Sequence, residues 1–192
     1  NEGYKNLVQL VSRANTEGMY YKPRVDKELL RKYSKGLICL SACIAGEVPA
    51  WIIRGDMYRA EKALQEYLEI FGPENYFIEI QNHGMAEEKI AMDGIIPLAK
   101  KYNLGLVATN DAHYLKKEDS EFHEVLLCIQ TGKNLDDPNR MKFSSDDYYL
   151  KSPEEMAGIF REYPEAIANT VKISSRCHVE FDFDHRHLPL FP

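Results

Sequence analysis

Two residues with metal-ligating side chains lie two positions apart in the segment Ala108-Thr-Asn-Asp-Ala-His-Tyr114. Asp111 and His113 follow the apolar run 106–109, which predicts a buried strand. Alternate residues of an extended chain share a face, so both side chains can turn toward one pocket. A carboxylate oxygen and a neutral imidazole nitrogen together suit zinc, manganese or iron. The alternative, from position alone, is an aspartate that caps the next turn with a surface histidine beside it.

Cys43 follows a second apolar run, 37–40. A thiolate at this position would favour zinc, whereas the alternative is a small buried residue without a ligand role. We interpret the other three cysteines, Cys39, Cys128 and Cys177, as core residues. Four scattered cysteines do not form a disulfide framework in a chain of this size, so we expect reduced thiols in a cytoplasmic protein.

A third polar junction follows the run 76–80. Glu79 and Gln81 alternate along this run, and His83 stands just before Gly84. These three side chains are candidates for hydrogen bonding to metal ligands or for contact with a substrate. For His83 the alternative is a histidine that simply occupies a turn.

The remaining histidines give weaker signals. His123 beside Glu124 fits a solvated or packed pair in a helix, and we reject His185 and His187 as ligands because no predicted strand ends there. The chain has no Ser-His-Asp order, phosphate-binding loop or glycine-rich dinucleotide motif, so we assign no catalytic residue. Because zinc sites usually take three or four protein ligands, the spacing alone predicts an incomplete metal site.

The elements that would position these residues alternate between helix and strand. Strands are predicted at 37–40, 76–80 and 106–109, and helices at 4–14, 26–33, 56–70, 87–102, 120–131, 152–160 and 164–176, with Asp26 and Asp56 as N-caps. Residues 141–150 fit a loop or a marginal strand. Short buried strands between helices indicate an α/β fold with a parallel sheet, whose functional residues gather at the carboxyl ends of the strands. Three strands leave open edges, so we expect further strands upstream and self-association of this piece.

Composition excludes several classes of protein. The 192 residues are 44% hydrophobic and 28% charged, as in a soluble globular domain, and no apolar run approaches the roughly 20 residues of a membrane span. Acidic residues outnumber basic ones 30 to 24, which gives a net charge of −6 and argues against tight binding of duplex DNA by this piece alone. The first residues enter a helix without a leader or an initiator methionine, so we expect a fragment of a longer protein.

Several motifs, in order along the chain, resemble the PHP domain of bacterial DNA polymerase III alpha subunits. They are Gly3-Tyr-Lys-Asn-Leu-Val-Gln-Leu-Val-Ser12, Leu40-Ser-Ala-Cys-Ile-Ala-Gly-Glu47, Glu79-Ile-Gln-Asn-His-Gly84, Val107-Ala-Thr-Asn-Asp-Ala-His-Tyr-Leu115, His123-Glu-Val-Leu-Leu-Cys-Ile-Gln-Thr-Gly-Lys133, Tyr149-Leu-Lys-Ser-Pro-Glu-Glu-Met156 and Leu188-Pro-Leu-Phe-Pro192. The resemblance implies a portion of a distorted (βα)7 PHP barrel with parallel strands and flanking helices. It assigns residues 1–187 to the C-terminal part of that domain and 188–192 to the start of a linker toward the polymerase core.

The resemblance also implies a site and partners. It places Cys43, Asp111 and His113 among the ligands of a divalent-metal cluster, with the remaining ligands upstream of Asn1. In the longer protein it implies DNA replication by a DNA-directed DNA polymerase, with DNA, a separate proofreading exonuclease and the sliding clamp as partners. The PHP domain would supply either a 3′–5′ exonuclease or a structural role, and the fragment itself would be inactive. The rivals are a free-standing phosphoesterase similar to histidinol phosphatase and a purely structural docking module.

Overall fold

The computed structural model describes residues 1–185, which divide into two compact units. The first unit contains residues 1–37 together with the segment from Ile173 onward, and the second contains Ile38–Lys172. The described residues do not include His187, nor the predicted linker 188–192 and its boundary with the domain. Within residues 1–185, no helix is both long enough and apolar enough to cross a membrane.

The first unit is built around two helices and a small hairpin. Its elements are α1 (Glu2–Thr16), β1 (Met19–Tyr20), β2 (Lys22–Pro23) and α2 (Lys27–Tyr33). The side chain of Asp26 accepts a hydrogen bond from the Leu29 N–H at 2.8 Å and so caps α2, as the sequence predicts. A Cβ on Gly3 would lie 1.9 Å from the Gly36 carbonyl oxygen. Only glycine at position 3 therefore lets the backbone of Gly36 lie this close to α1. The hairpin was not predicted, because two-residue strands leave no periodic pattern.

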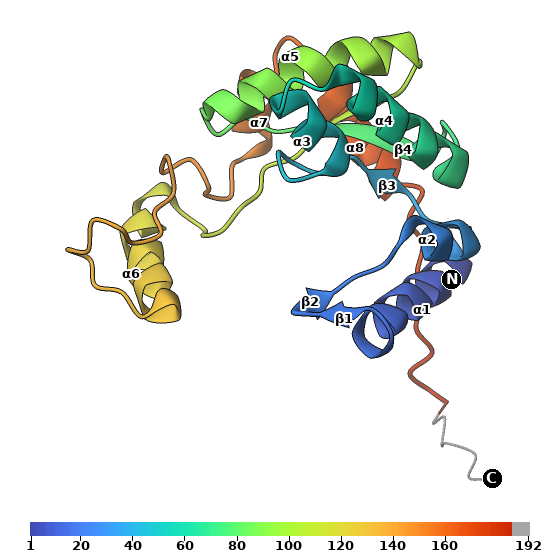
Figure 1. Cartoon of the computed structure of the whole chain (residues 1–192), viewed down its shortest axis with the longest axis horizontal. Coiled ribbons are helices and arrows are strands. Elements are labelled where there is room, and N and C mark those ends of the chain that lie inside the picture. The colour runs from blue at the N-terminus through green and yellow to red at the C-terminus, as the bar shows by residue number, and fades with distance from the viewer. Residues whose placement is uncertain (186–192) are drawn as a thin grey trace. The chain divides into compact units, whose positions relative to one another are not determined.

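A three-stranded parallel sheet forms the centre of the second unit. Figure 1 labels its first two strands. Its strands are β3 (Cys39–Leu40), β4 (Tyr76–Ile80) and β5 (Leu106–Ala108), in the order β3-β4-β5. The register pairs Leu40 with Phe77 and Ile80 with Ala108. The carboxyl ends of the strands therefore lie at one edge of the sheet, as expected for βα units.

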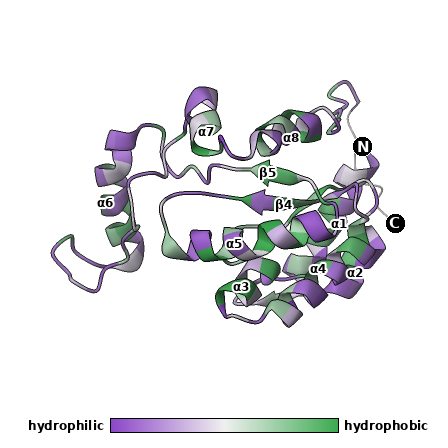
Figure 2. Ribbon diagram, turned by 90° about the horizontal axis from the view of Figure 1, so that it is seen from above, coloured by the Kyte–Doolittle hydropathy of each residue, from purple (hydrophilic) through white to green (hydrophobic). Residues whose placement is uncertain are grey.

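Helices lie on both sides of these strands (Figure 2). On one side are α3 (Glu47–Ile53), α4 (Met57–Phe71) and α5 (Ala86–Lys101), and on the other are α7 (Pro153–Ile159) and α8 (Pro164–Ser174). The core between them is apolar, and Leu64, Ile78 and Ile95 are almost completely buried. The Asn169 side chain of α8 donates to the Leu106 carbonyl at 2.7 Å, which satisfies part of the outer edge of β5.

A further helix of the second unit, α6 (Ser120–Thr131), follows a 3-10 turn at Lys117–Asp119. The α/β fold with a parallel sheet and flanking helices confirms the predicted fold class. Residues 141–150 contain no strand, and their only bridge among the described residues pairs Tyr149 with Tyr114. Helix α3 was missed, because its seven residues include Pro49 and Trp51 and give little helical periodicity. Cys177 is exposed, so its interpretation as a core residue is wrong; it follows the end of α8, where no element covers it.

Candidate functional site

Asp111 and His113 lie together in the loop after β5. Oδ1 of Asp111 is 3.3 Å from Nε2 of His113, and both side chains are about 40% exposed, at 43% and 38%. Asp111 has a φ of 51°, in the left-handed region, which costs a non-glycine residue on the order of 1 kcal/mol and is better tolerated by aspartate than by most residues. The loop therefore depends on its surroundings to keep this conformation.

The segment 145–151 holds the loop through its backbone. The N–H of His113 donates to the Tyr148 carbonyl at 2.7 Å, and the N–H of Leu150 donates to the Tyr114 carbonyl at 3.0 Å. Through these bonds, Tyr114 and Tyr149 form an isolated parallel bridge in the chain that follows β5. The backbone at His113 and Tyr114 is thus held by residues 148–150.

Aromatic side chains surround the His113 ring. Its centroid lies 4.8 Å from the Phe143 ring, nearly perpendicular to it, and 5.6 Å from the His123 ring. Burial, followed by the neighbouring His113, lowers the pKa of His123. His123 is therefore part of this aromatic group rather than one half of a pair with Glu124, whose carboxylate accepts from Arg140 instead.

Cys43 lies elsewhere in the unit, beside the end of β3. It lines a cavity of about 20 Å³, room for roughly one water molecule, together with Glu79, Gln81, Glu88 and apolar side chains. Neither Asp111 nor His113 lines this cavity. Within residues 1–185, no three or more His, Cys, Asp or Glu side chains form a group that could hold a metal ion. Of the three predicted ligands, the structure thus brings together only Asp111 and His113. Two ligands are fewer than a bound zinc ion needs, and we derive no step through a metal.

Glu79 and Gln81 join the ends of all three strands. The Thr109 hydroxyl donates to Oε1 of Glu79 at 2.5 Å, and Nε2 of Gln81 donates to the Thr109 hydroxyl oxygen at 2.9 Å. The backbone N–H of Glu79 also donates to the Ser41 hydroxyl at 2.9 Å. The two side chains thus tie the end of β4 to Thr109 after β5, while the Ser41 hydroxyl ties the end of β3 to the β4 backbone. Glu79 and Gln81 line the same small cavity as Cys43.

His83 is 2% exposed and has partners on both ring nitrogens. Its Nδ1 lies 2.6 Å from Oε1 of Glu88, and its Nε2 contacts the Asn110 carbonyl oxygen. The ring stacks on Tyr148 with centroids 4.4 Å apart and planes 4° from parallel. Burial lowers the pKa of His83, but the bonds to Glu88 and Asn110 outweigh it, and the pKa lies above its ordinary value. With no ring nitrogen left for a substrate, His83 is a buried connector between loops.

Two charged residues in this region, Glu88 and Lys151, are buried although the sequence analysis did not predict it. Glu88 points inward from the first turn of α5, and Lys151 donates to the Asn110 side-chain oxygen at 3.2 Å. Burial lowers the pKa of Lys151. A signal for Glu88 was present, because it shares the helix face of the buried residues Ala91 and Ile95. No comparable signal exists for Lys151, which belongs to a loop.

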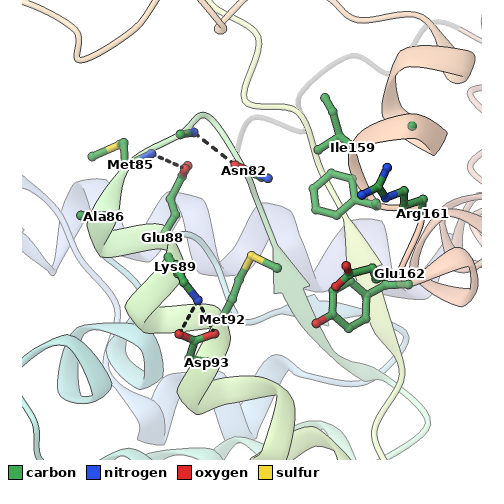
Figure 3. A pocket seen from close by; sticks show the side chains of 14 residues that line it. Asn82, Met85, Ala86, Glu88, Lys89, Met92, Asp93, Ile159, Arg161 and Glu162 are labelled. Atoms are coloured by element: carbon green, nitrogen blue, oxygen red, sulfur yellow. Dashed lines mark hydrogen bonds and ion pairs between the residues drawn. The ribbon is translucent and has the colours of Figure 1, made fainter.

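A larger hollow of about 570 Å³ lies between the start of α5 and the end of α7 (Figure 3). Both positively and negatively charged side chains line the hollow. Among them, Lys89 forms an ion pair with Asp93 at 2.8 Å. Figure 3 also shows Glu88 turned toward the backbone of Met85 rather than into the hollow. None of the predicted ligands lines it.

Comparison with known proteins shows what the chain is similar to. The PHP domain family matches residues 1–83. The DNA polymerase III subunit alpha of Treponema pallidum (strain Nichols) is 50% identical over 189 residues, which cover 98% of this chain and 16% of the relative. The subunit alpha of Thermus aquaticus is 47% identical over 196 residues (99% and 16%), and that of Deinococcus radiodurans is 46% identical over 185 residues (93% and 14%).

The fold and the family match define an α/β segment that carries part of a PHP domain. Over nearly its whole length, this segment is similar to a part of bacterial DNA polymerase III alpha subunits, which confirms the resemblance drawn from its motifs. The chain spans about a sixth of the length of these relatives.

Proposed function

We propose that this chain works as part of the PHP domain within a bacterial replicative DNA polymerase, a DNA-directed DNA polymerase that acts in the cytoplasm. The observation that carries the proposal is the 50% identity to a DNA polymerase III subunit alpha across 98% of the chain. In the longer protein, residues 1–187 form the C-terminal part of the PHP domain and 188–192 lead toward the polymerase core. DNA, a proofreading exonuclease and the sliding clamp are then partners of the whole subunit rather than of this piece.

The proposed contribution of the chain is one side of a divalent-metal site. Asp111 and His113 provide an oxygen and a nitrogen 3.3 Å apart, and Cys43 provides a thiol at the end of another strand of the same sheet. This donor set suits zinc, manganese or iron. Ligands outside the chain must complete the site, because these residues alone form no group of three.

The completed site would serve a metal-dependent 3′–5′ exonuclease, and in its absence the domain would act structurally. Multi-metal hydrolysis of phosphodiesters needs cations that polarise the phosphoryl group and activate water. The chain by itself supplies too few ligands for this chemistry, so we propose that the fragment is inactive. The exposure of both Asp111 and His113 leaves their ligand atoms open to a partner segment.

Primer-extension and 3′-end degradation assays test this proposal. We expect the longer protein to extend a primed template, and the 192-residue chain to do neither reaction with added manganese or zinc. Hydrolysis of DNA by the chain alone, abolished by Asp111→Ala, would refute its inactivity. Release of phosphate from p-nitrophenyl phosphate by the chain alone would favour a free-standing phosphoesterase instead.

The docking-module alternative makes a different prediction for the same residues. If the domain is purely structural, Asp111→Ala and His113→Ala in the longer protein change stability or partner binding and leave metal content and activity unchanged. Loss of metal together with loss of 3′-end degradation supports the metal site.

A further inference from the structure

We propose that His83 is a positioning residue for the Asp111–His113 pair, and that it acts through its Nε2 hydrogen bond to the Asn110 carbonyl. The metal role of that pair rests on the function proposed above. The positioning itself rests on the contacts of His83, Asn110 and their neighbours, which exist without any metal.

The hydrogen-bonding partners determine where the protons of His83 lie. A backbone carbonyl oxygen only accepts, so Nε2 must carry a proton and donate it to Asn110. Nδ1 faces the Glu88 carboxylate at 2.6 Å, and the His83 backbone N–H donates to the other Glu88 oxygen, also at 2.6 Å. The ring is thus held on one side by α5 and offers a fixed donor to the loop after β5.

Asn110 is the residue on which these contacts converge. Its carbonyl accepts from His83, its side-chain NH₂ donates to the Tyr149 carbonyl at 2.8 Å, and its side-chain oxygen accepts from Lys151 at 3.2 Å. Both ends of the residue are therefore fixed, by α5 through His83 and by the 148–151 segment. The carbonyl of Asn110 belongs to the peptide bond that leads into Asp111.

This peptide plane precedes the strained residue of the site. Because Asp111 adopts a left-handed φ of 51°, its side-chain direction depends on the orientation of the peptide before it. His113, two residues later, is fixed by its own N–H bond to the Tyr148 carbonyl. The approach of the Asp111 carboxylate to the His113 ring thus requires that the Asn110 carbonyl keep its place, which the His83 ring secures.

Two substitutions at one position separate positioning from simple packing. In His83→Gln the amide nitrogen reaches the place of Nε2, so the bond to Asn110 is kept and the bond to Glu88 is lost. In His83→Asn the shorter amide reaches the place of Nδ1, so the bond to Glu88 is kept and the bond to Asn110 is lost. Each variant loses one buried hydrogen bond and the same ring stacking, which makes them matched controls.

Hydrogen–deuterium exchange of the 192-residue chain, without metal, provides the decisive measurement. We expect the amides of 111–113 to exchange about tenfold faster in His83→Asn than in His83→Gln, roughly the effect of one hydrogen bond, with equal exchange in β4 and β5. Equal exchange of 111–113 in the two variants, or faster exchange spread evenly over β4 and β5, would overturn the proposal.

A measurement on the unsubstituted chain covers the case in which a variant does not fold. Nitrogen-15 NMR is expected to show that Nε2 of His83 carries a proton at neutral pH, and an unprotonated Nε2 would overturn the proposal. In the longer protein, weaker manganese binding by His83→Asn than by His83→Gln would extend the role to the metal site. If the unsubstituted longer protein binds no metal, the proposed metal site fails while the exchange result still decides the positioning.

Discussion

The Glu88 carboxylate makes two hydrogen bonds with His83: Oε2 accepts from the backbone N–H, and Oε1 lies against the ring Nδ1, each at 2.6 Å. The two side chains are 7% and 2% exposed, so this ion pair lies inside the second unit. It links the first turn of α5 to the loop that follows β4, and through the His83 ring it reaches the loop after β5.

Removal of this carboxylate should destabilise the chain strongly. Glu88→Ala leaves a buried imidazole without its acceptor, and we expect a loss of about 3 kcal/mol in the free energy of unfolding. Glu87→Ala, on the exposed neighbour, should change stability by less than about 0.5 kcal/mol. Urea unfolding followed by circular dichroism gives both values, and similar losses in the two variants would contradict the importance of the pair.

The same pair should make stability depend on pH. The pKa of His83 lies above its ordinary 6.5, so its contribution is present below pH 6.5 and is lost as the pH rises through the folded-state pKa. Burial raises the pKa of Glu88, but its bonds to His83 hold it below 4.5, so its contribution is lost as the pH falls through that lower value. The stability difference between the unsubstituted chain and His83→Gln should be largest between about pH 4.5 and 6.5 and shrink at higher pH. If the stability difference between the two proteins instead grows from pH 6.5 to 9, His83 is not stabilised in its protonated, imidazolium form.

The cysteines should differ in their reactivity. Burial and the nearby Glu79 raise the pKa of Cys39 to about 11, so little thiolate forms at pH 8, whereas Cys177 is exposed. We expect iodoacetamide to modify Cys177 first and Cys39 much more slowly, as measured by peptide mass spectrometry. Modification of both at the same rate in the folded chain would show that β3 opens readily.

Self-association should involve α6 rather than the outer edge of β5. Phe122, Leu126 and Ile129 lie one helical turn apart and are 69%, 61% and 72% exposed, while Asn169 already bonds to the edge of β5. The double variant Leu126→Lys, Ile129→Lys should remain monomeric at concentrations where the 192-residue chain associates, with Glu121→Lys on the same helix as the control. Light scattering after size exclusion measures this, and unchanged association of the double variant would exclude α6.

The sequence predicted well those elements whose pattern is local. The bounds of β4 and α6 agree with the predicted ranges, because an apolar run between turn residues and a helical period are both visible without tertiary contacts. The caps at Asp26 and Asp56 were equally predictable, since the capping bond spans only three residues.

The site was predictable only in part. Asp111 and His113 do approach each other, but from a loop in which Asp111 has a left-handed φ of 51°, and not from the extended segment that the spacing argument assumed. The connection of His83 to Asn110 spans 27 residues and that of Lys151 to Asn110 spans 41, and no local pattern encodes such distances. The placement of Cys43 beside Glu79 and Gln81 likewise follows from strand order in the sheet, which depends on tertiary packing.

The metal content of the longer protein that contains this segment tests the central claim most directly. Plasma mass spectrometry of that protein and its Asp111→Ala, His113→Ala double variant should show near-stoichiometric zinc, manganese or iron in the first and its loss in the second. The 192-residue chain should carry only traces, because the pair supplies two ligands. Equal metal content in the longer protein and its double variant would contradict the assignment of Asp111 and His113 as ligands.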